Sequence, residues 1–195
     1  MREWAGTVFT IAMGLILTIY FSIEGESTYN WALSFIPSES RSRLDAALRR
    51  AEVRMGKWLI GQGSLMLILG VASTIVYRAL DVRYAYALGV LTGLLNVVPV
   101  LGAALSIALS MLAGAVDSWG RVLGIGIFYG IYLQVENSIL IPRIMKHSVD
   151  LPALAILVAL IIGSALAGIV GALVSVPTAV LVSVLLEEYW VMKEA

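Results

Sequence analysis

Two stretches of this chain, residues 84–116 and 151–186, carry no charged side chain over 33 and 36 consecutive positions. As straight helices they would be about 50 Å long, because a helix rises about 1.5 Å per residue. The hydrocarbon core of a bilayer is only about 30 Å thick, and about 20 helical residues cross it. Each stretch therefore has to tilt steeply, kink, or fold back on itself as a hairpin.

The composition indicates that lipid is the solvent for most of the chain. Of its 195 residues, 60% are hydrophobic and 13% are charged, whereas soluble domains average about 45–50% apolar and about 25% charged residues. We therefore expect an all-α polytopic integral membrane protein. It would have about five hydrophobic segments, two of them long and broken by Gly and Pro, and a basic amphipathic helix on the cytoplasmic side.

We expect residues 1–195 to form a single membrane domain. Two ordinary spans and the amphipathic helix precede the first long segment, and a span with polar residues separates the two long segments. The expected order is a span at 5–23, an amphipathic interfacial helix at 38–57, a span at 58–77, a broken segment or hairpin at 84–116, a span with a polar cluster at 122–142, and a broken segment or hairpin at 151–190.

Six basic residues between positions 41 and 57 place that loop on the cytoplasmic side. The amphipathic helix there either lies on the membrane surface or packs on the cytoplasmic face of its own protein. The N-terminus is then outside. If both long segments are hairpins, Arg143, Lys146, His147 and the C-terminus are cytoplasmic. If each is a single kinked span, the loops at 117–121 and 143–147 exchange sides.

Both long segments contain Gly and Pro in similar patterns. The first includes GLLNVVPVLG at 93–102 and the second includes GIVGALVSVP at 168–177, and both fit G-x-L-x-x-V-P. Pro and Gly disturb a helix, and backbone freed at membrane depth has to be buried in protein or face a watery cavity. Paired interrupted segments point to a transporter binding site; the alternative is coincidence in a chain rich in Gly, Leu and Val.

A polar cluster lies inside the apolar span 122–142, where Gln134, Glu136 and Asn137 follow one another closely. A charged side chain at the middle of a membrane helix costs about 2.5–3.5 kcal/mol on insertion scales, so Glu136 is not expected to face lipid. It either serves a ligand, a cation or a proton, or it holds helices together by hydrogen bonds. Asn96, beside Pro99, either joins freed carbonyls in binding or caps a helix.

Several classes of function are excluded by what the sequence lacks. It has no Cys and a single His, and it contains no G-x-x-x-x-G-K-[ST] motif. Thiolate metal sites, thiol catalysis and ATP hydrolysis by this chain are therefore excluded. The formal net charge of zero argues against nucleic acid as a partner. We expect no enzyme activity and no cofactor.

The sequence resembles the autoinducer-2 exporter family of permeases over nearly all of its length. The residues that carry the resemblance are GLLNVVPVLGAALS, then YLQVENSILIPRIMKHSVDLPALAILVALIIGSALAGIVGALVSVPTAVLVSVL. The resemblance implies homo-oligomers that work without ATP, and it implies either export of autoinducer-2 or sodium/proton antiport. It places family motifs at Asn96, Pro99, Gly102, Gln134, Glu136, Asn137, Pro142, Arg143, Gly168, Gly171 and Pro177.

Two departures limit what the resemblance implies. Family members carry about eight spans, with further helices ahead of the part seen here, so the chain is either a truncated or a naturally short member. Ala103 stands where many members have a proline, which softens the expected break after Gly102.

These observations lead to the expectation of a secondary transporter of the inner membrane that exports a small polar organic solute such as autoinducer-2. The first alternative is a sodium (or lithium)/proton antiporter that uses Glu136. The second is a non-transporting scaffold, or a half-transporter that needs a partner. The expected partners are the solute or Na+ and H+, the lipid bilayer and further copies of the chain. The expected pathway residues are Glu136, Gln134, Asn137, Asn96, Pro99, Gly102, Gly171 and Pro177.

Overall fold

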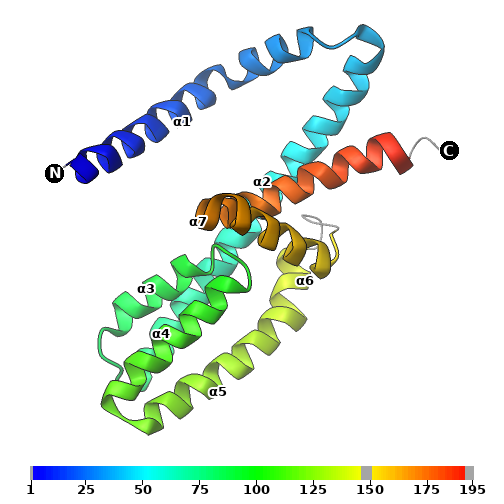
Figure 1. Ribbon diagram of the computed structural model, residues 1–195. Coiled ribbons are helices and arrows are strands. Elements are labelled where there is room, and N and C mark those ends of the chain that lie inside the picture. Colours follow the sequence, from blue (N-terminus) through cyan, green and yellow to red (C-terminus); the bar gives the residue numbers. More distant parts are fainter. Residues whose placement is uncertain (1, 146–150, 192–195) are drawn as a thin grey trace. The chain divides into compact units, whose positions relative to one another are not determined.

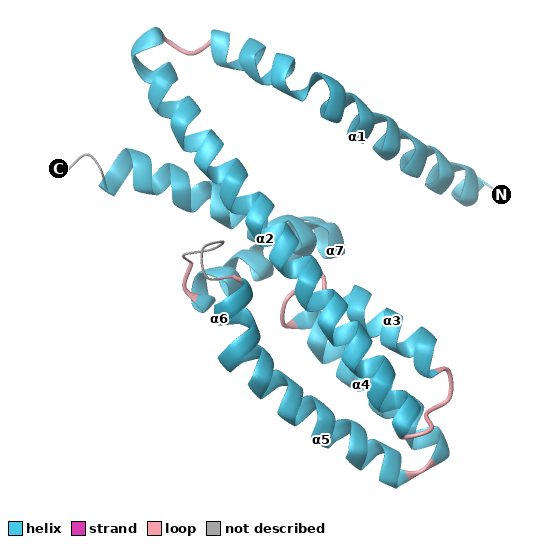
Figure 2. Cartoon of the chain, turned by 180° about the vertical axis from the view of Figure 1, so that it is seen from behind, coloured by secondary structure: helices cyan, strands magenta, loops and turns pink. Residues whose placement is uncertain are grey.

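The computed structural model describes residues 2–145 and 151–191, and these residues form helices and no strand (Figures 1 and 2). The chain divides into two compact units, Met1–Ala47 and Leu48–Ala195. The all-α membrane class expected from the composition is confirmed. Three helical stretches of the described residues are long and apolar enough to cross a membrane: Ser38–Ala79, Trp119–Ile144 and Leu154–Tyr189.

The first unit contains helix α1 (Arg2–Ser34) and the beginning of helix α2 (Ser38–Ala79). The expected span 5–23 lies within α1. Where α1 ends, the guanidinium of Arg41 donates a hydrogen bond of 3.0 Å to the backbone carbonyl of Ser34. The last carbonyls of a helix have no partner inside the helix, so this arginine satisfies one of them.

Helix α2 runs without interruption over 42 residues. The expected amphipathic helix 38–57 and the expected span 58–77 are therefore one helix, because no proline or turn sequence separates them. Two arginines of the basic face of α2 form ion pairs within the second unit. Arg54 pairs with Glu187 at 3.1 Å, and Arg50 pairs with Glu188. These contacts favour a helix packed on its own protein over one lying flat on the membrane.

The segment 84–116 is a pair of short helices that returns to the end where it began. Helices α3 (Ala85–Leu95) and α4 (Leu101–Asp117) have 11 and 17 residues, so each is shorter than the about 20 residues that cross a bilayer. The two outer ends of the pair are held together, because Arg83, just before α3, forms a 3.2 Å ion pair with Asp117.

Helix α5 (Trp119–Val135) continues into a π-helical turn, η1 (Glu136–Leu140), and then into the short helix α6 (Ile141–Ile144). Pro142 explains the wide turn. It has no N–H to donate, and its ring would clash with the carbonyl four residues earlier, so the backbone widens ahead of it. The result is one long rod with a local break at Glu136.

Helix α7 (Ala153–Leu186) reverses direction within its length, at Ala167 and Gly168, and is followed by the π-helical turn η2 (Glu187–Val191) (Figure 1). A Cβ added to Gly163 would lie 3.0 Å from the carbonyl carbon of Gly171. Residues eight apart in a straight helix are about 12 Å apart. The break therefore lies before the G-x-L-x-x-V-P motif of this segment, and Pro177 stays inside a helix.

The interior between α2, α3, α4 and α5 is held by a cluster of hydroxyl groups. The hydroxyl of Tyr77 bonds to Ser110 at 2.5 Å, to Tyr129 at 2.8 Å and to Thr92 at 3.3 Å. All four side chains are at most 2% exposed. Inside a bilayer, hydrogen bonds and close packing drive helix association in place of the hydrophobic effect. This cluster was not predicted from the sequence, because tyrosine and threonine in spans also fit ordinary packing.

Candidate functional site

Glu136 is the buried acid at the break of the fifth helix. Glu136 is the first residue of the π-helical turn η1, and it is 8% exposed. Single π-helical turns inside longer helices are frequent at functional sites.

Asn96 lies beside Glu136 and belongs to the break between α3 and α4. It is the residue at which α3 ends, it is 4% exposed, and its side chain lies beside the Glu136 carboxylate. Its backbone carbonyl is free of the helix, and it accepts a 2.6 Å hydrogen bond from Nε2 of Gln62 on α2. Three helices therefore converge on one polar cluster, which we call the Glu136 cluster: Gln62, Asn96 and Glu136.

Gln62 was not among the candidates drawn from the sequence. It is 4% exposed and lies within the span expected at 58–77. The available signal was that it is the one amide side chain of that span. A single amide in an apolar helix has to find a partner, and a carbonyl released by a neighbouring broken helix is such a partner.

The charge of Glu136 is not balanced inside the described part of the protein. Glu136 forms no ion pair with another described residue, and its Oε2 atom is buried without a hydrogen-bond partner there. A buried carboxylate without compensation is costly, so it tends to bind a proton, a cation or a hydrogen-bond donor. The cluster therefore has the chemistry to bind a small polar or positively charged species.

Gln134 and Asn137 do not join this cluster. Both side chains are exposed and make local hydrogen bonds: Gln134 donates to Ser138 at 3.0 Å, and Asn137 donates to the carbonyl of Leu133 at 2.8 Å. Neighbours one or two positions apart on a helix point in different directions, so burying Glu136 turns both amides outward. Whether they serve the pathway stays a prediction.

Pro99 and Gly102 form the turn between α3 and α4. Pro99 is half-buried and Gly102 is buried. Between them, Val100 has a φ of 67°, which is rare for a β-branched residue and stores strain of about 1–3 kcal/mol. Such strain persists only where the surroundings fix the backbone, and here Gly102 packs against the backbone of Leu95 and Asn96.

Gly171 and Pro177 lie in the second half of α7, and both are half-buried. This helix reaches the α3–α4 turn through an apolar contact among Val98, Leu160 and Ala172. The Gly/Pro motifs of the two long segments are thus neighbours. The contact that connects them is apolar, and Asn96 is the polar residue of these motifs that lies beside Glu136.

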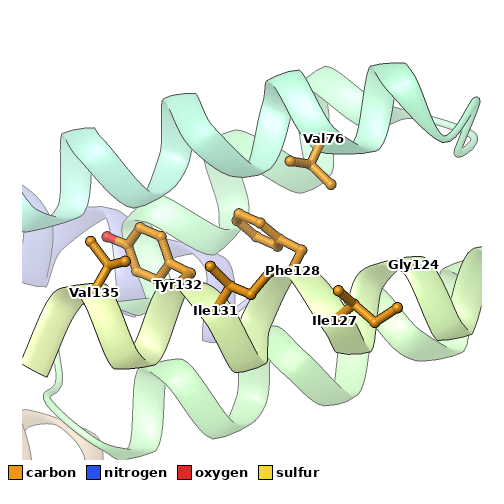
Figure 3. A pocket seen from close by; sticks show the side chains of 7 residues that line it. All are labelled: Val76, Gly124, Ile127, Phe128, Ile131, Tyr132 and Val135. Carbon is orange, nitrogen blue, oxygen red and sulfur yellow. The ribbon is translucent and has the colours of Figure 1, made fainter.

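A shallow apolar groove of about 380 Å³ runs along the outside of the α2–α5 pair (Figure 3). Its apolar lining suits a hydrocarbon chain better than a polar solute. Tyr132 is one of its lining residues, and the hydroxyl of Tyr132 points along α5 toward Val135. The lining residues are Val76, Gly124, Ile127, Phe128, Ile131, Tyr132 and Val135.

Within residues 2–145 and 151–191, no three His, Cys, Asp or Glu side chains come together as a metal centre would require. Lys146 and His147, which are expected on the cytoplasmic side if both long segments are hairpins, lie outside the described residues.

A helical membrane protein that buries an unbalanced carboxylate beside two helix breaks has the construction of a membrane transporter. The sequence supports this class, because residues 1–190 match the AI-2E family transporter profile. The chain therefore belongs to the AI-2E transporter family.

Individual relatives agree with this family. YrrI of Bacillus subtilis (strain 168), whose name assigns it to transport, is 28% identical over 186 residues, which are 95% of this chain and 53% of YrrI. The AI-2 transport protein TqsA of Escherichia coli (strain K12) is 32% identical over 152 residues, 73% of this chain and 42% of TqsA. The chain thus spans about half the length of the curated relatives that it matches.

Proposed function

We propose that this chain is a secondary transporter or permease of the inner membrane that exports a small polar organic solute such as autoinducer-2 and uses no ATP. The observation that carries the proposal is Glu136, buried at a helix break with one carboxylate oxygen unpaired among the described residues. Asn96 and Gln62 add amide groups on the same spot. Amides and a carboxylate are the groups that bind hydroxyl and amino groups of a polar solute.

The solute is chosen from the relatives. TqsA is named an AI-2 transport protein, so autoinducer-2 is the first solute to test. As further parts of the proposal, the chain catalyses no reaction, binds no cofactor and assembles into homo-oligomers in the membrane. Its N-terminus lies outside and its C-terminus in the cytoplasm.

Solute export is expected to depend on the charge of Glu136. Proteoliposomes containing the protein and loaded with autoinducer-2 should release it at least about ten-fold more slowly when Glu136→Gln replaces the wild type. A hydrogen bond to a charged group contributes about 1.5–3 kcal/mol, and about 1.4 kcal/mol corresponds to ten-fold. The measurement is the initial rate of efflux at matched protein content.

Glu52→Gln is the matched control, because Glu52 is exposed on α2 and its substitution removes one carboxylate without touching the Glu136 cluster. It should export at the wild-type rate. Equal efflux from wild type and Glu136→Gln would remove Glu136 from the pathway. Efflux from wild-type proteoliposomes that is no faster than efflux from loaded liposomes without protein would show that this chain does not export autoinducer-2 by itself.

Sodium/proton antiport is the second candidate, and the unpaired Oε2 atom of Glu136 is the observation that favours it. A carboxylate that lacks a partner binds either a proton or Na+, and exchange of one for the other is antiport. An imposed sodium gradient should then change the internal pH of proteoliposomes, as reported by a trapped dye, and Glu136→Gln should abolish the change. Wild-type protein that gives no sodium-dependent signal would exclude antiport by this chain.

A further inference from the structure

Three buried oxygen atoms, one on α2 and two on the rod formed by α5 and η1, have no hydrogen-bond partner among the residues that the structure describes: Ser73 Oγ, Tyr132 OH and Glu136 Oε2. The three residues are 0%, 7% and 8% exposed. Buried polar atoms in native proteins are almost always paired, and those without a protein partner commonly bind an ordered water or a ligand. Three such atoms on two facing helices suggest one shared occupant.

The packing of the two helices shows which residues face one another. A Cβ added at Gly124 on α5 would lie 2.8 Å from the side chain of Leu80, near the end of α2. A Cβ added at Gly61, in the middle of α2, would lie 3.4 Å from Ile144, which follows α5 in α6. The two helices therefore run antiparallel, with the end of one beside the beginning of the other.

This register places the unpaired oxygens at neighbouring levels. Tyr77 and Tyr129 meet across the pair through a 2.8 Å hydrogen bond. Ser73 precedes Tyr77 by four residues and Tyr132 follows Tyr129 by three, so both lie one turn from that bond in the same direction. Glu136 lies one turn further, and it interacts electrostatically with Tyr132.

The side chain of Tyr132 is oriented toward the level of Glu136. Its hydroxyl points along α5 toward Val135, which is the side of Glu136 (Figure 3). The other groups that face the carboxylate are neutral: the amide of Asn96 and, bonded to the Asn96 carbonyl, the amide of Gln62. The nearest basic residue along the same rod, Arg143, is exposed and two turns away.

We propose that Ser73, Tyr132 and Glu136 enclose an internal hydration site, whose water exchanges protons with Glu136. One water can accept hydrogen bonds from the hydroxyls of both Tyr132 and Ser73 and donate one to Glu136 Oε2, so a single molecule satisfies all three oxygens. In the exchange step the O–H bond of the protonated carboxyl breaks as its proton passes to the water oxygen, and one O–H bond of the water breaks as a different proton returns to the carboxylate, so that the two groups have exchanged protons. Only O–H bonds form and break.

This inference deepens the proposed function, because it names the route by which Glu136 gains and loses a proton. Infrared spectroscopy of the protein in lipid nanodiscs tests it. The carboxylic acid band that disappears in Glu136→Gln identifies the protonated group. After transfer into heavy water, the rate at which this band shifts measures proton exchange at Glu136. Tyr132→Phe and Ser73→Ala are each expected to slow the shift at least about ten-fold.

The matched control is Tyr84→Phe, which removes a phenol hydroxyl from a side chain that is 82% exposed and should leave the exchange rate unchanged. The double variant Tyr132→Phe/Ser73→Ala should be no slower than the slower single variant, because both residues hold the same water. Ser73→Thr, which restores a hydroxyl, should recover much of the rate. A general loss of packing would not be rescued in this way.

Wild-type exchange rates in both Tyr132→Phe and Ser73→Ala would overturn the hydration site. It would also be overturned if no acid band were lost in Glu136→Gln at any pH at which the protein stays folded. If the band instead vanished as sodium replaced choline at constant ionic strength, the occupant would be a cation and not water. The outcome is independent of solute export, since the band reports Glu136 whether or not autoinducer-2 moves.

Discussion

Replacing Gly102 by alanine is expected to destabilise the α3–α4 turn by about 3 kcal/mol, near the upper end of the usual range for overpacking. The added Cβ would lie 2.7 Å from the Cα of Asn96 and directly against the carbonyl of Leu95. Both neighbours are backbone, so neither can rotate away as a flexible side chain would. The turn would have to open, and Asn96 would leave Glu136.

The measurement is thermal unfolding of the purified protein in detergent, followed by circular dichroism, where about 3 kcal/mol corresponds to a fall of roughly 10 °C in the midpoint. Gly130→Ala is the control, because a Cβ at Gly130 would meet nothing within 4 Å. Alanine favours a helix over glycine by about 1 kcal/mol, so this variant should be as stable as wild type or more so. Equal midpoints for both variants would show that the turn is not tightly packed.

The sequence was sufficient to locate the acid and the break but not the partners of the acid. Glu136 and Asn96 were identified because a carboxylate and an amide are costly in a membrane span, and the structure places the two together. Gln62 is an amide that needs a partner in a span, and Tyr132 is an aromatic residue that fits a span without difficulty, but the sequence does not show which groups they meet. Their role depends on which helix faces which, and that register is set by long-range packing.

The orientation of the neighbouring amides shows a second limit. Gln134 and Asn137 were grouped with Glu136 because they are close along the chain, yet on a helix such neighbours occupy different faces. The π-helical turn alters the angles further, and its presence depends on how the rod accommodates Pro142. In α7 the reversal occurs at Gly168, the first residue of the stretch 168–177 in which a break was expected, and not at Pro177, which stays inside the helix.

Gly171 is expected to be the residue that allows the two halves of α7 to pack against each other. A Cβ at this position would be pressed against the carbonyl of Gly163 and would lie 3.1 Å from Cβ of Ala167. Gly171→Ala should therefore force the halves apart, with a loss of stability of about 3 kcal/mol. Gly168→Ala is the comparison variant, because it changes the backbone conformation at the reversal without adding a steric contact between the two halves. Gly168 has a φ of 58° and nothing within 4 Å of an added Cβ. The substitution should therefore cost only about 1–3 kcal/mol of backbone strain and leave the two halves in contact.

Spin labels at two exposed positions, Leu157 and Thr178, measure the separation of the halves directly. The chain has no cysteine of its own, so two introduced cysteines carry the only labels. In a straight helix, positions 21 residues apart would be about 32 Å apart. The wild type and Gly168→Ala should give a much shorter distance, because residues 163 and 171 are in contact. Gly171→Ala should give a longer and broader distribution. A wild-type distance of about 32 Å would mean that α7 does not reverse in the membrane, and an unchanged distance in Gly171→Ala would mean that the Gly163–Gly171 contact does not hold the reversal closed.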